Sequence, residues 1–520
     1  MIKSTIDPAC TGQFSPLFLD YIQQKDNLRP FYHFFPSLTN FRELIEGRSF
    51  DSHRRTILTQ VLQSQYQGFE LTEATTVNIE RLKNPDTFTV TTGHQLNLFT
   101  GPLYFIYKIV STINLADQLK QAYPGFHFVP VYWMASEDHD FAEIDHFYFD
   151  GKEYSWKTNQ TGAVGEFRLD EGMEALLKEV AFIPEFFKKA YQEHHTLADA
   201  VRYYVNYLFG DKGLVVIDGN SADLKALFSP IIKDDLFHHS AKALVEATME
   251  KLEQMGYKNQ IFPREINFFY LDKGVRARIE KVGEDYIVLD SDLSFSSAEI
   301  EELVARFPEK FSPNVVMRPL YQEYILPNIA YLGGPAEVAY WLQLKALFKH
   351  YGTDFPAVMP RNFVMILDNF AQRKMDALGL RDEEIFADYD QWKKAYVIAH
   401  AGQDITLQAE KTNLAEIFAI IEQKAKVADP TLGPSANAAH KRAQKIMEQM
   451  AEKLRKAEER GLATALNRMQ DLKRTLFPGG SPQERKNNFM QFYLADPQFI
   501  EKLYAHLDPL NYDFIILRKQ

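Results

Sequence analysis

The chain of 520 residues contains a single cysteine, Cys10. One thiol cannot close a disulfide within the chain or build a cysteine-rich zinc site, which is typical of a reducing compartment. No run reaches the roughly 18 apolar residues of a membrane-spanning helix, because Lys108 interrupts the best candidate, GPLYFIYKIV. The opening MIKSTIDPACTG lacks the apolar core of a signal peptide. We therefore expect a cytoplasmic globular protein with no membrane partner, in which Cys10 is a passive thiol.

A surplus of positive charge is also missing. The 58 Lys and Arg residues are outnumbered by 70 Asp and Glu residues, and the formal net charge is -12. Binding along a phosphate backbone needs Lys and Arg gathered on one face, so we expect no nucleic-acid partner. The net charge does not exclude a local basic pocket that binds a single nucleotide. The length exceeds what a single core supports, and about three structural units are expected.

The apolar pattern alternates between strands and helices in the manner of an α/β fold. Thr87–Thr92 is β-branched and lies between turn residues, Pro102–Leu119 has helical spacing, and Phe126–Ala135 is a second apolar run. A strand, a helix and a strand within about fifty residues form a right-handed crossover with parallel strands. Leu214–Gly219 and Asn314–Leu320 resume the strand pattern, and a helix is expected from Tyr321. The sequence therefore predicts a Rossmann-like parallel sheet.

Changes in pattern divide the chain into segments. The region 222–312 contains alternating runs that predict antiparallel strands, and the region after 375 is rich in Ala, Glu, Lys, Gln and Leu. Apolar residues in a long predicted helix, Ala436–Leu476, repeat at steps of three and four on both sides of Gly461, which predicts a coiled-coil hairpin and a homodimer through it. The predicted segments are the N-terminal core (1–144), a helical insertion (145–213), a core strand (214–221), an α+β insertion (222–312), the core return (313–375), an α-helical coiled-coil arm (376–480) and a tail packed on the core (481–520).

The first candidate site is the turn TTGHQ after the first strand. Ligands bind at the carboxyl ends of parallel strands because unpaired N–H groups and a helix dipole favour anions there. Gly93 would let the backbone approach a phosphate, while His94 and Gln95 would donate hydrogen bonds. The alternative is a surface histidine in an ordinary loop.

The second candidate is SEDHD, Ser136–Asp140, which follows the next strand. Crowded ionisable residues at a strand end favour a ligand, and a carboxylate near an imidazole orients it for acid–base work or holds an ammonium group. Asp138, His139 and Asp140 are the candidate residues. The alternative is a solvated helix start with acidic caps. His139 and His146 lie seven apart, which is no established metal-ligand spacing, so no metal is assigned.

Two further turns carry candidate residues. Gly333 and Gly334 precede a helix whose first turn contains Glu337, an arrangement that suits an anion but lacks the spacing of a known phosphate loop. Asp218 and Asn220 end the third strand, where they would contact a ribose or an amine, or cap the next helix.

Four blocks carry a resemblance to a known family. TGHQLNLFTGPLY, VPVYWMASEDHDFAEIDH, MRPLYQEYILPNIAYLGGPAEVAYW and PRNF resemble the cysteine-adding enzymes of bacillithiol biosynthesis (BshC), in order and over nearly the whole chain. The resemblance implies a Rossmann-like core with two inserted connective domains, similar to class I aminoacyl-tRNA synthetases, and a helical dimerisation arm. It also implies a ligase that joins the carboxyl group of cysteine to the amine of glucosaminyl-malate.

The resemblance also implies how a site would be divided. Amide formation needs an activated carboxyl, for which ATP (leaving ADP if a phosphate is transferred) is the expected donor. Residues expected on the phosphate or leaving-group side are Gly93, His94 and Gln95, and Thr92 is expected to bind substrate or nucleotide. Those expected to hold the amine or act as base are Asp138, His139 and Asp140, which together with His94 are the expected catalytic residues. Gly333, Gly334 and Glu337 would close the other wall.

The sequence departs from a synthetase at two places. TGHQ has one histidine where those enzymes have two, and no lysine-rich loop for the triphosphate is present, so PRNF offers only Arg361. Two alternatives to the ligase therefore stay open: a nucleotide-binding interaction protein whose coiled coil recruits partners without ligase chemistry, and a nucleotidyltransferase acting on another small molecule.

Overall fold

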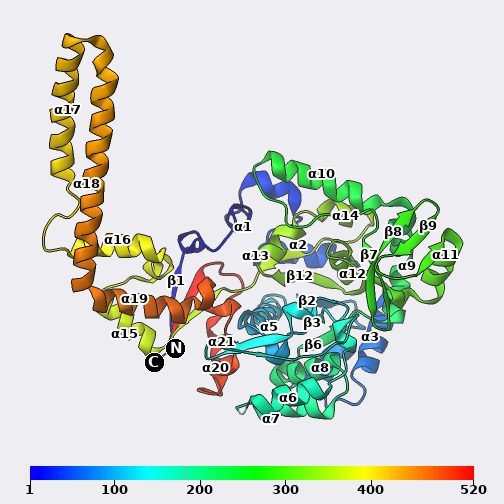
Figure 1. The fold of residues 1–520 in the computed structure, drawn as a ribbon. Helices are drawn as coiled ribbons and strands as arrows, with labels where there is room; N and C mark the ends of the chain where they lie inside the picture. The colour runs from blue at the N-terminus through cyan, green and yellow to red at the C-terminus, as the bar shows by residue number, and fades with distance from the viewer. Residues whose placement is uncertain (181, 520) are drawn as a thin grey trace. The chain divides into compact units, whose positions relative to one another are not determined.

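The computed structural model describes residues 1–180 and 182–519. It divides into two compact units, one formed chiefly by residues 3–365 and 482–517 and the other chiefly by residues 366–481. Figure 1 shows that the first unit combines sheets and helices and that the second is helical. We call them unit 1 and unit 2. The finer segment boundaries expected from the sequence stay predictions.

A five-stranded parallel sheet forms the centre of unit 1. Its order is β13-β12-β2-β3-β6, and every neighbouring pair is parallel. This sheet confirms the predicted Rossmann-like α/β fold. The strand bounds are β2 Thr87–His94, β3 His127–Met134, β6 Val215–Asp218, β12 Asn328–Gly333 and β13 Ala357–Pro360.

The crossover predicted around the first two strands is confirmed. Helix α5, Tyr104–Ala122, joins β2 to β3 and begins just after Pro102, a residue that suits a first helical turn. Apolar side chains of the sheet and of the helices beside it form one buried cluster. Its members include Phe41 of α2 (Leu38–Gly47), Phe88 and Val90 of β2, Leu115 and Leu119 of α5, and Leu332 of β12. Burial of this apolar surface drives the sheet and helices together.

The strand predicted at Asn314–Leu320 is wrong. Strand β11 ends at Pro313, and helix α12, Met317–Ile325, begins inside the predicted strand. The Asn314 side chain accepts hydrogen bonds from the backbone N–H groups of Val316 and Met317, at 2.8 and 3.2 Å. These bonds start a helix, and the apolar run that suggested a strand is the buried face of that helix.

Two groups of elements are inserted between strands of the parallel sheet. Between β3 and β6 lie a β-hairpin and three helices: β4 His146–Phe149, β5 Lys152–Ser155, α6 Glu171–Glu179, α7 Glu185–Glu193 and α8 Leu197–Phe209. Between β6 and β12 lies an antiparallel sheet, β10-β9-β8-β7-β11, which confirms the predicted alternating runs. Its bounds are β7 Phe268–Asp272, β8 Val275–Val282, β9 Asp285–Val288, β10 Ser294–Ser296 and β11 Phe311–Pro313, with α9 Ala222–His238, α10 Ser240–Gln254 and α11 Ser297–Arg306.

Apart from the helices of unit 2, the remaining elements are a small sheet and α-helices of 4 to 14 residues. A three-stranded sheet has the order β1-β15-β14. The bounds are β1 Ile2–Ile6, β14 Val364–Leu367, β15 Phe514–Arg518, α1 Pro16–Ile22, α2 Leu38–Gly47, α3 Ser52–Gln65, α4 Glu73–Arg81, α13 Pro335–Trp341, α14 Lys345–His350, α20 Met490–Tyr493 and α21 Phe499–His506.

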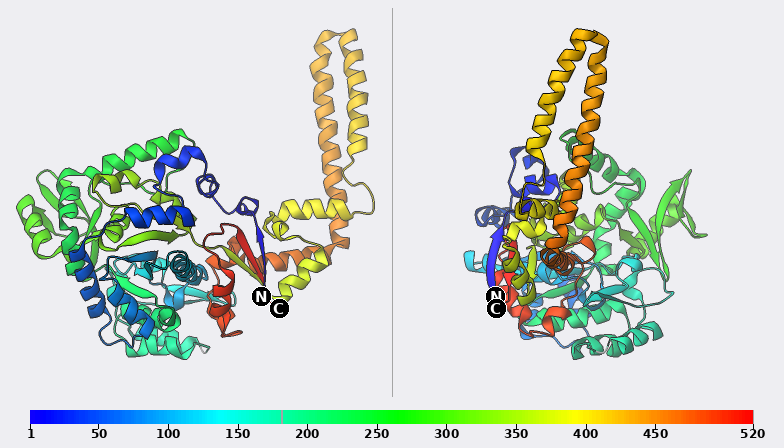
Figure 2. Two further views of the ribbon diagram at one scale, coloured as in Figure 1. Left: turned by 180° about the vertical axis from the view of Figure 1, so that it is seen from behind. Right: turned by 60° about the vertical axis from the view of Figure 1, so that its left-hand side comes forward.

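Unit 2 contains the predicted helical hairpin. Helices α17 and α18 run side by side in Figures 1 and 2, and the long helix predicted at Ala436–Leu476 is broken at Leu462 into α18 and α19. Met469, Leu472 and Leu476 of α19 are buried within unit 2, so this stripe is internal packing. Ile446 and Met450 of α18 are 64% and 50% exposed, and dimerisation through the arm stays a prediction. The bounds are α15 Asn369–Leu378, α16 Tyr389–His400, α17 Gln408–Ala428, α18 Gly433–Gly461 and α19 Ala463–Leu476.

Across the described ranges, the helices are too short or too polar to cross a membrane.

Candidate functional site

The carboxyl ends of the parallel strands carry most of the predicted site residues. The register aligns Gly93 with Trp133, Met134 with Asp218, and Gly333 with Pro360. The turns that follow β12, β2, β3 and β6 therefore lie in sequence along one edge of the sheet. What differs between them is whether their side chains face open space or the protein interior.

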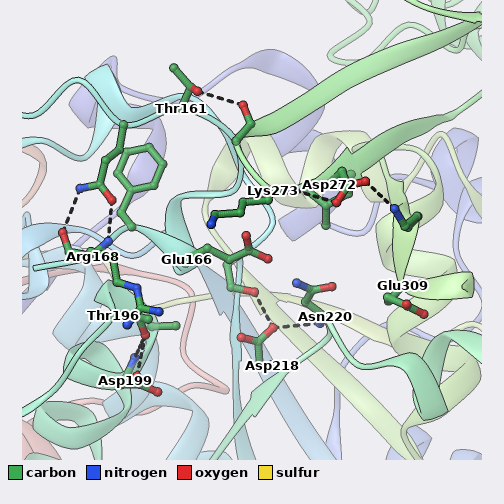
Figure 3. A pocket seen from close by; sticks show the side chains of 18 of the residues that line it. Thr161, Glu166, Arg168, Thr196, Asp199, Asp218, Asn220, Asp272, Lys273 and Glu309 are labelled. Carbon is green, nitrogen blue, oxygen red and sulfur yellow. Dashed lines mark hydrogen bonds and ion pairs between the residues drawn. The ribbon is translucent and has the colours of Figure 1, made fainter. Parts of the chain in front are cut away.

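A cavity of about 930 Å³ opens beside the ends of β3 and β6. Ser136, Asp218 and Asn220 line it from the sheet edge. Figure 3 shows Asp218 and Asn220 in this position. The opposite walls come from the two inserted regions. The lining residues from those insertions include Gln160, Thr161, Glu166 and Arg168 of the first, and Asp272, Lys273, Glu309 and Lys310 of the second.

Asp218 is held in place at the floor of the cavity. Its carboxylate accepts hydrogen bonds from the Ser136 hydroxyl and from the backbone N–H of Asn220, the latter at 2.9 Å. Burial raises the pKa of Asp218 above its usual value, although both hydrogen bonds act in the opposite direction. Nearby, the buried Lys225 pairs with Glu137 and donates to the carbonyl oxygen of Glu309 at 3.0 Å. The floor is therefore a fixed polar surface.

Glu166 extends over this floor from the first insertion, as Figure 3 shows. The pKa of Glu166 is raised because its carboxyl is partly removed from water and faces Asp218 and Asp272. Five carboxyl groups and three cationic groups line the cavity. An excess of carboxyl groups, two of them with raised pKa, suits an amine or ammonium group better than a polyphosphate.

Two loops contact each other over the cavity. The Thr161 hydroxyl donates to the carbonyl oxygen of Gly274 at 2.9 Å. Gly162 has a φ of +93°, and a Cβ atom there would lie 2.8 Å from the carbonyl carbon of Gly274. The backbones approach this closely because Gly162 has no Cβ atom, whereas a Cβ atom on Gly274 would meet only the Thr161 hydroxyl oxygen, at 3.7 Å. This contact fixes the β7–β8 turn against the first insertion.

We expect Gly162→Ala to destabilise unit 1 by about 2–3 kcal/mol, from a left-handed backbone and from overlap with Gly274. Gly283→Ala is the matched control: its φ is +64°, but its Cβ would meet nothing within 4 Å. The control is expected to cost about 1 kcal/mol. Urea unfolding midpoints measure both, and equal costs would show that the loop contact contributes nothing.

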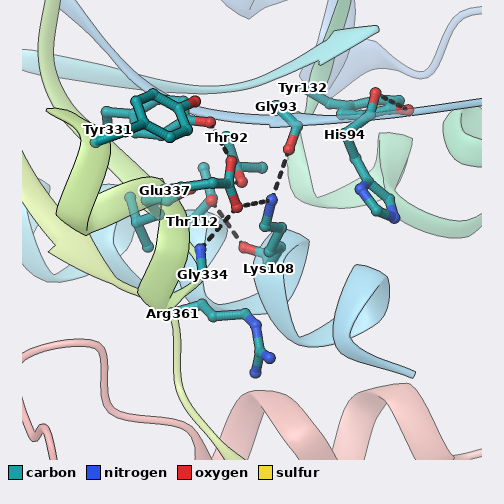
Figure 4. A network of polar contacts seen from close by, with 12 residues as sticks. Thr92, Gly93, His94, Lys108, Thr112, Tyr132, Tyr331, Gly334, Glu337 and Arg361 are labelled. Atoms are coloured by element: carbon teal, nitrogen blue, oxygen red, sulfur yellow. Dashed lines mark hydrogen bonds and ion pairs between the residues drawn. The ribbon is translucent and has the colours of Figure 1, made fainter. Parts of the chain in front are cut away.

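A buried polar network joins the turns after β2 and β12 (Figure 4). Lys108 of α5 is 3% exposed, donates to the carbonyl oxygen of Gly93 at 2.8 Å and forms an ion pair with Glu337. Glu337 also accepts from the Gly334 N–H at 2.7 Å and the Tyr331 hydroxyl at 2.5 Å. The Glu337 carboxylate thus binds Lys108, Tyr331 and the Gly334 N–H, and the expectation that Gly334 and Glu337 form a cavity wall stays a prediction. Gly333 likewise has its carbonyl oxygen bonded, by the N–H of Arg361 at 2.9 Å.

His94 lies beside this network and is 9% exposed. Its ring packs against Tyr104 and Phe105 at centroid distances of 5.2 Å each, and its Nε2 has no hydrogen-bond partner among the described residues. Burial, together with the charges of Lys108 and Arg361, holds the pKa of His94 well below its usual value, so the ring is neutral. The neighbouring Thr92 hydroxyl donates to the carbonyl oxygen of Leu332 at 2.8 Å.

Gln95 connects the first turn to the SEDHD loop. Its side-chain amide donates to Asp138 at 2.9 Å and to Glu143 at 2.6 Å. Burial alone would raise the pKa of Asp138, but the bond from Gln95 and the charge of Arg276 outweigh it, and the pKa is lowered. Asp138 is therefore an ionised structural anchor of the loop.

His139 and Asp140 lie on the exposed side of the same loop. Arg276 of β8 donates to Nδ1 of His139 at 2.6 Å. Burial and the charge of Arg276 lower the pKa of His139, which fits a neutral acceptor. Asp140 contributes its N–H to the Asp138 carboxylate at 3.4 Å.

Arg361 is committed to another part of unit 1. It is 2% exposed and forms a bidentate ion pair with Glu484. Its two terminal guanidinium nitrogens donate to the two carboxylate oxygens of Glu484, at 2.9 and 2.7 Å. It also donates to the carbonyl oxygen of Asn362 at 2.8 Å. The guanidinium ties the β13–β14 connection to the 482–517 segment, and a role of Arg361 on a triphosphate stays a prediction.

Several residues of the cavity were missed from the sequence. Glu166, Arg168 and Lys273 lie in inserted regions, and no local pattern sets them apart from surface charges. Lys108 did carry a signal, because it is the one charged residue in an otherwise apolar first half of a helix. A buried lysine at such a position indicates a buried carboxylate partner. No group of three or more potential metal ligands is found among residues 1–180 and 182–519.

Comparisons with known proteins match both units. The family model described as "Bacillithiol biosynthesis BshC, N-terminal Rossmann-like domain" matches residues 1–362, and the C-terminal coiled-coil model of the same family matches residues 364–519. A protein of Cytophaga hutchinsonii named "Putative cysteine ligase BshC" is 43% identical over 501 residues, 96% of each chain. A protein of the same name from Flavobacterium psychrophilum is 41% identical over 521 residues, 98% of each chain.

One solved structure, titled as a putative arginyl-tRNA synthetase from Campylobacter jejuni, covers 84% of this chain and 98% of its own at 13% identity. Its TM-score of 0.22 is too low to support an argument. The two family models match residues in both units, and the two relatives align over 96% and 98% of this chain. The chain therefore belongs to the BshC family of bacillithiol biosynthesis.

Proposed function

We propose that this chain is a ligase that joins the carboxyl group of L-cysteine to the amine of glucosaminyl-malate, giving bacillithiol. The proposal rests on the family and on one observation: the cavity at the carboxyl edge of the parallel sheet presents Glu166 and Asp218, two carboxyl groups with raised pKa, around a polar floor. Such groups hold an ammonium ion and accept its proton.

The proposed reaction needs an activated cysteine carboxyl and a neutral amine. The amine nitrogen attacks the carbonyl carbon, the C–N bond forms, and the bond to the leaving group breaks. Glu166 takes the proton that the nitrogen loses. Its pKa is raised towards the working pH, and a carboxylate with such a pKa is a better general base than one with an ordinary pKa. Asp218 and Ser136 hold the amino substrate at the floor, where their own hydrogen bond fixes the carboxylate.

ATP is the proposed source of activation. The residues expected to bind its phosphates, however, do not fit that role in this structure. Gln95 donates to two carboxylates, the Gly93 carbonyl is bonded to Lys108, and Arg361 is paired with Glu484. We therefore assign no residue to the triphosphate and no step to its transfer.

The catalytic roles of His94, Asp138, His139 and Asp140 stay predictions. His94 is the strongest of them, because its unpartnered Nε2 is buried next to two cations. A buried polar atom without a partner costs free energy, and such atoms deserve a functional explanation. Glu166 is placed ahead of it here because it faces the cavity directly.

The function is tested with the purified full-length chain, cysteine, glucosaminyl-malate and ATP. We expect a new thiol with the mass of the two substrates joined with loss of one water, detected by mass spectrometry after thiol labelling. A deletion strain should accumulate glucosaminyl-malate and lack bacillithiol. An unchanged thiol pool in that strain would instead support the interaction protein without ligase chemistry.

A further inference from the structure

Two cations of the cavity have no carboxylate partner. Arg168, from the first insertion, and Lys273, from the β7–β8 turn, both line it, and neither forms an ion pair within the described ranges. Figure 3 shows the Lys273 side chain extending towards the wall that carries Arg168. Lysine and arginine side chains that line a cavity without a counter-ion are suited to an anionic ligand.

The other cations nearby already have partners within the protein, and Lys310 and Lys225 are neutralised by carboxylates. Lys310 pairs with Asp272, and Lys225 pairs with Glu137 beneath the floor. Arg276 lies over the Phe269 ring at 4.1 Å and donates to His139. The free positive charge of the cavity is thus concentrated on Arg168 and Lys273.

Both residues are held by backbone contacts that do not use their charged ends. The Gln160 side chain accepts from the N–H of Arg168 at 2.7 Å and donates to its carbonyl oxygen at 2.9 Å. Lys273 precedes Gly274, whose carbonyl oxygen accepts the Thr161 hydroxyl. The backbone under each cation is therefore fixed while the charged group remains available, which is the arrangement of a prepared binding site.

The cavity consequently has two chemically different ends. The end at the sheet edge presents Asp218 and Ser136, with Glu166 above them, and suits an amine. The walls from the inserted regions present Arg168 and Lys273, beside the carboxylates Asp199 and Glu309 and the Lys310–Asp272 pair. Because the two cations have no carboxylate partner of their own, they suit the carboxylates of a ligand. A ligand that carries an amine on one part and carboxylates on another matches both ends at once.

We propose that Arg168 and Lys273 bind the malyl dicarboxylate of the amino substrate and so select glucosaminyl-malate over amino sugars without carboxylates. This assignment rests on the proposed function, since it places the amine of the same molecule at Glu166 and Asp218. Arg168 and Lys273 are specificity-determining residues that touch the malyl group of the substrate and not its reacting nitrogen.

The test compares two amines that share the same amino sugar ring, glucosaminyl-malate and methyl glucosaminide, the second of which has no carboxylate. Variants are Lys273→Met, Arg168→Gln and the double substitution. Matched controls are Lys281→Met and Arg278→Gln, both on β8 and outside the cavity lining. Each cavity variant should raise KM for glucosaminyl-malate by about 10–100-fold, as expected for a lost charged hydrogen bond. KM for methyl glucosaminide and kcat at saturation should not change.

Equal losses on both amines, or no loss on glucosaminyl-malate, would overturn the assignment. Calorimetric titration separates this outcome from failure of the proposed function. If the wild-type chain forms no amide, its affinity for glucosaminyl-malate relative to methyl glucosaminide still decides: a preference that disappears in the cavity variants supports the subsite, and the absence of any preference refutes it.

Discussion

We expect Glu166→Gln to lower the turnover of amide formation by about 10²–10⁴-fold, the range for removal of a general base. The substitution keeps the shape and the polarity of the side chain and removes only its ability to take a proton. Because Glu166 lies on the open wall of the cavity, the fold is expected to remain intact. Binding of glucosaminyl-malate should weaken less than turnover.

The pH dependence of turnover gives this prediction a second readout. A base acts in its deprotonated form, so activity rises with pH through its pKa. The pKa of Glu166 is raised, by partial burial and then by Asp218 and Asp272, so the rise should occur above the ordinary glutamate value of 4.5. In Glu166→Gln that rise should disappear from the profile, while a smaller one from Asp218, whose pKa is also raised, remains.

Glu171→Gln serves as the control, because this exposed residue of α6 does not line the cavity. Near wild-type turnover in Glu166→Gln would show that a residue other than Glu166 is the general base. His94→Ala and Asp138→Asn are then the decisive variants, since these two residues were predicted to act from the turns at the end of β2 and β3. Full activity in Glu166→Gln, His94→Ala and Asp138→Asn would show that the catalytic site does not lie at the carboxyl edge of the parallel sheet.

The fold was predictable from the sequence where local patterns agree with the tertiary context. The β-branched run of β2 and the helical spacing of α5 are local signals, and both were confirmed. The error at Asn314–Leu320 arose because a fully buried helix face and a buried strand have the same apolar run. The hydrogen bonds that the N–H groups of Val316 and Met317 donate to the Asn314 side chain decide between them, and these bonds are seen only in the three-dimensional structure.

The candidate site was predictable only in its location along the sheet edge. Parallel topology brings the turns after β2, β3, β6 and β12 to one side, and this follows from strand order. Which side chains face open space depends on the inserted regions, which pack against some turns and supply Glu166 and Lys273. Charged residues on such loops look like any solvated surface in the sequence. Glu337 differs from these loop residues because it lies at the start of a helix and is bound within the protein. Nothing in the sequence around Glu337 indicated its ion pair with Lys108 of α5.

The largest loss of stability is expected for Lys108→Met, about 3–5 kcal/mol, as for other buried ion pairs that lose one partner. Lys108 is 3% exposed and pairs with Glu337, so its removal leaves a carboxylate without a counter-ion inside unit 1. Lys120→Met is the matched control, since Lys120 is an exposed residue near the end of the same helix. An exposed substitution should stay within about 0.5 kcal/mol. Urea unfolding midpoints at neutral pH measure both.

Adding Glu337→Gln to Lys108→Met should recover part of this loss, because the double variant buries no unpaired charge. Acid pH tests the same pair independently. Burial would raise the pKa of Glu337, but Lys108 and the Gly334 N–H outweigh it and the pKa is lowered. Its stabilising contribution is therefore present above the unfolded carboxyl pKa and is lost as the pH falls through the folded value. The wild-type chain should lose more stability on acidification than Lys108→Met, and equal losses would show that Glu337 draws its stabilisation from its hydrogen bonds alone.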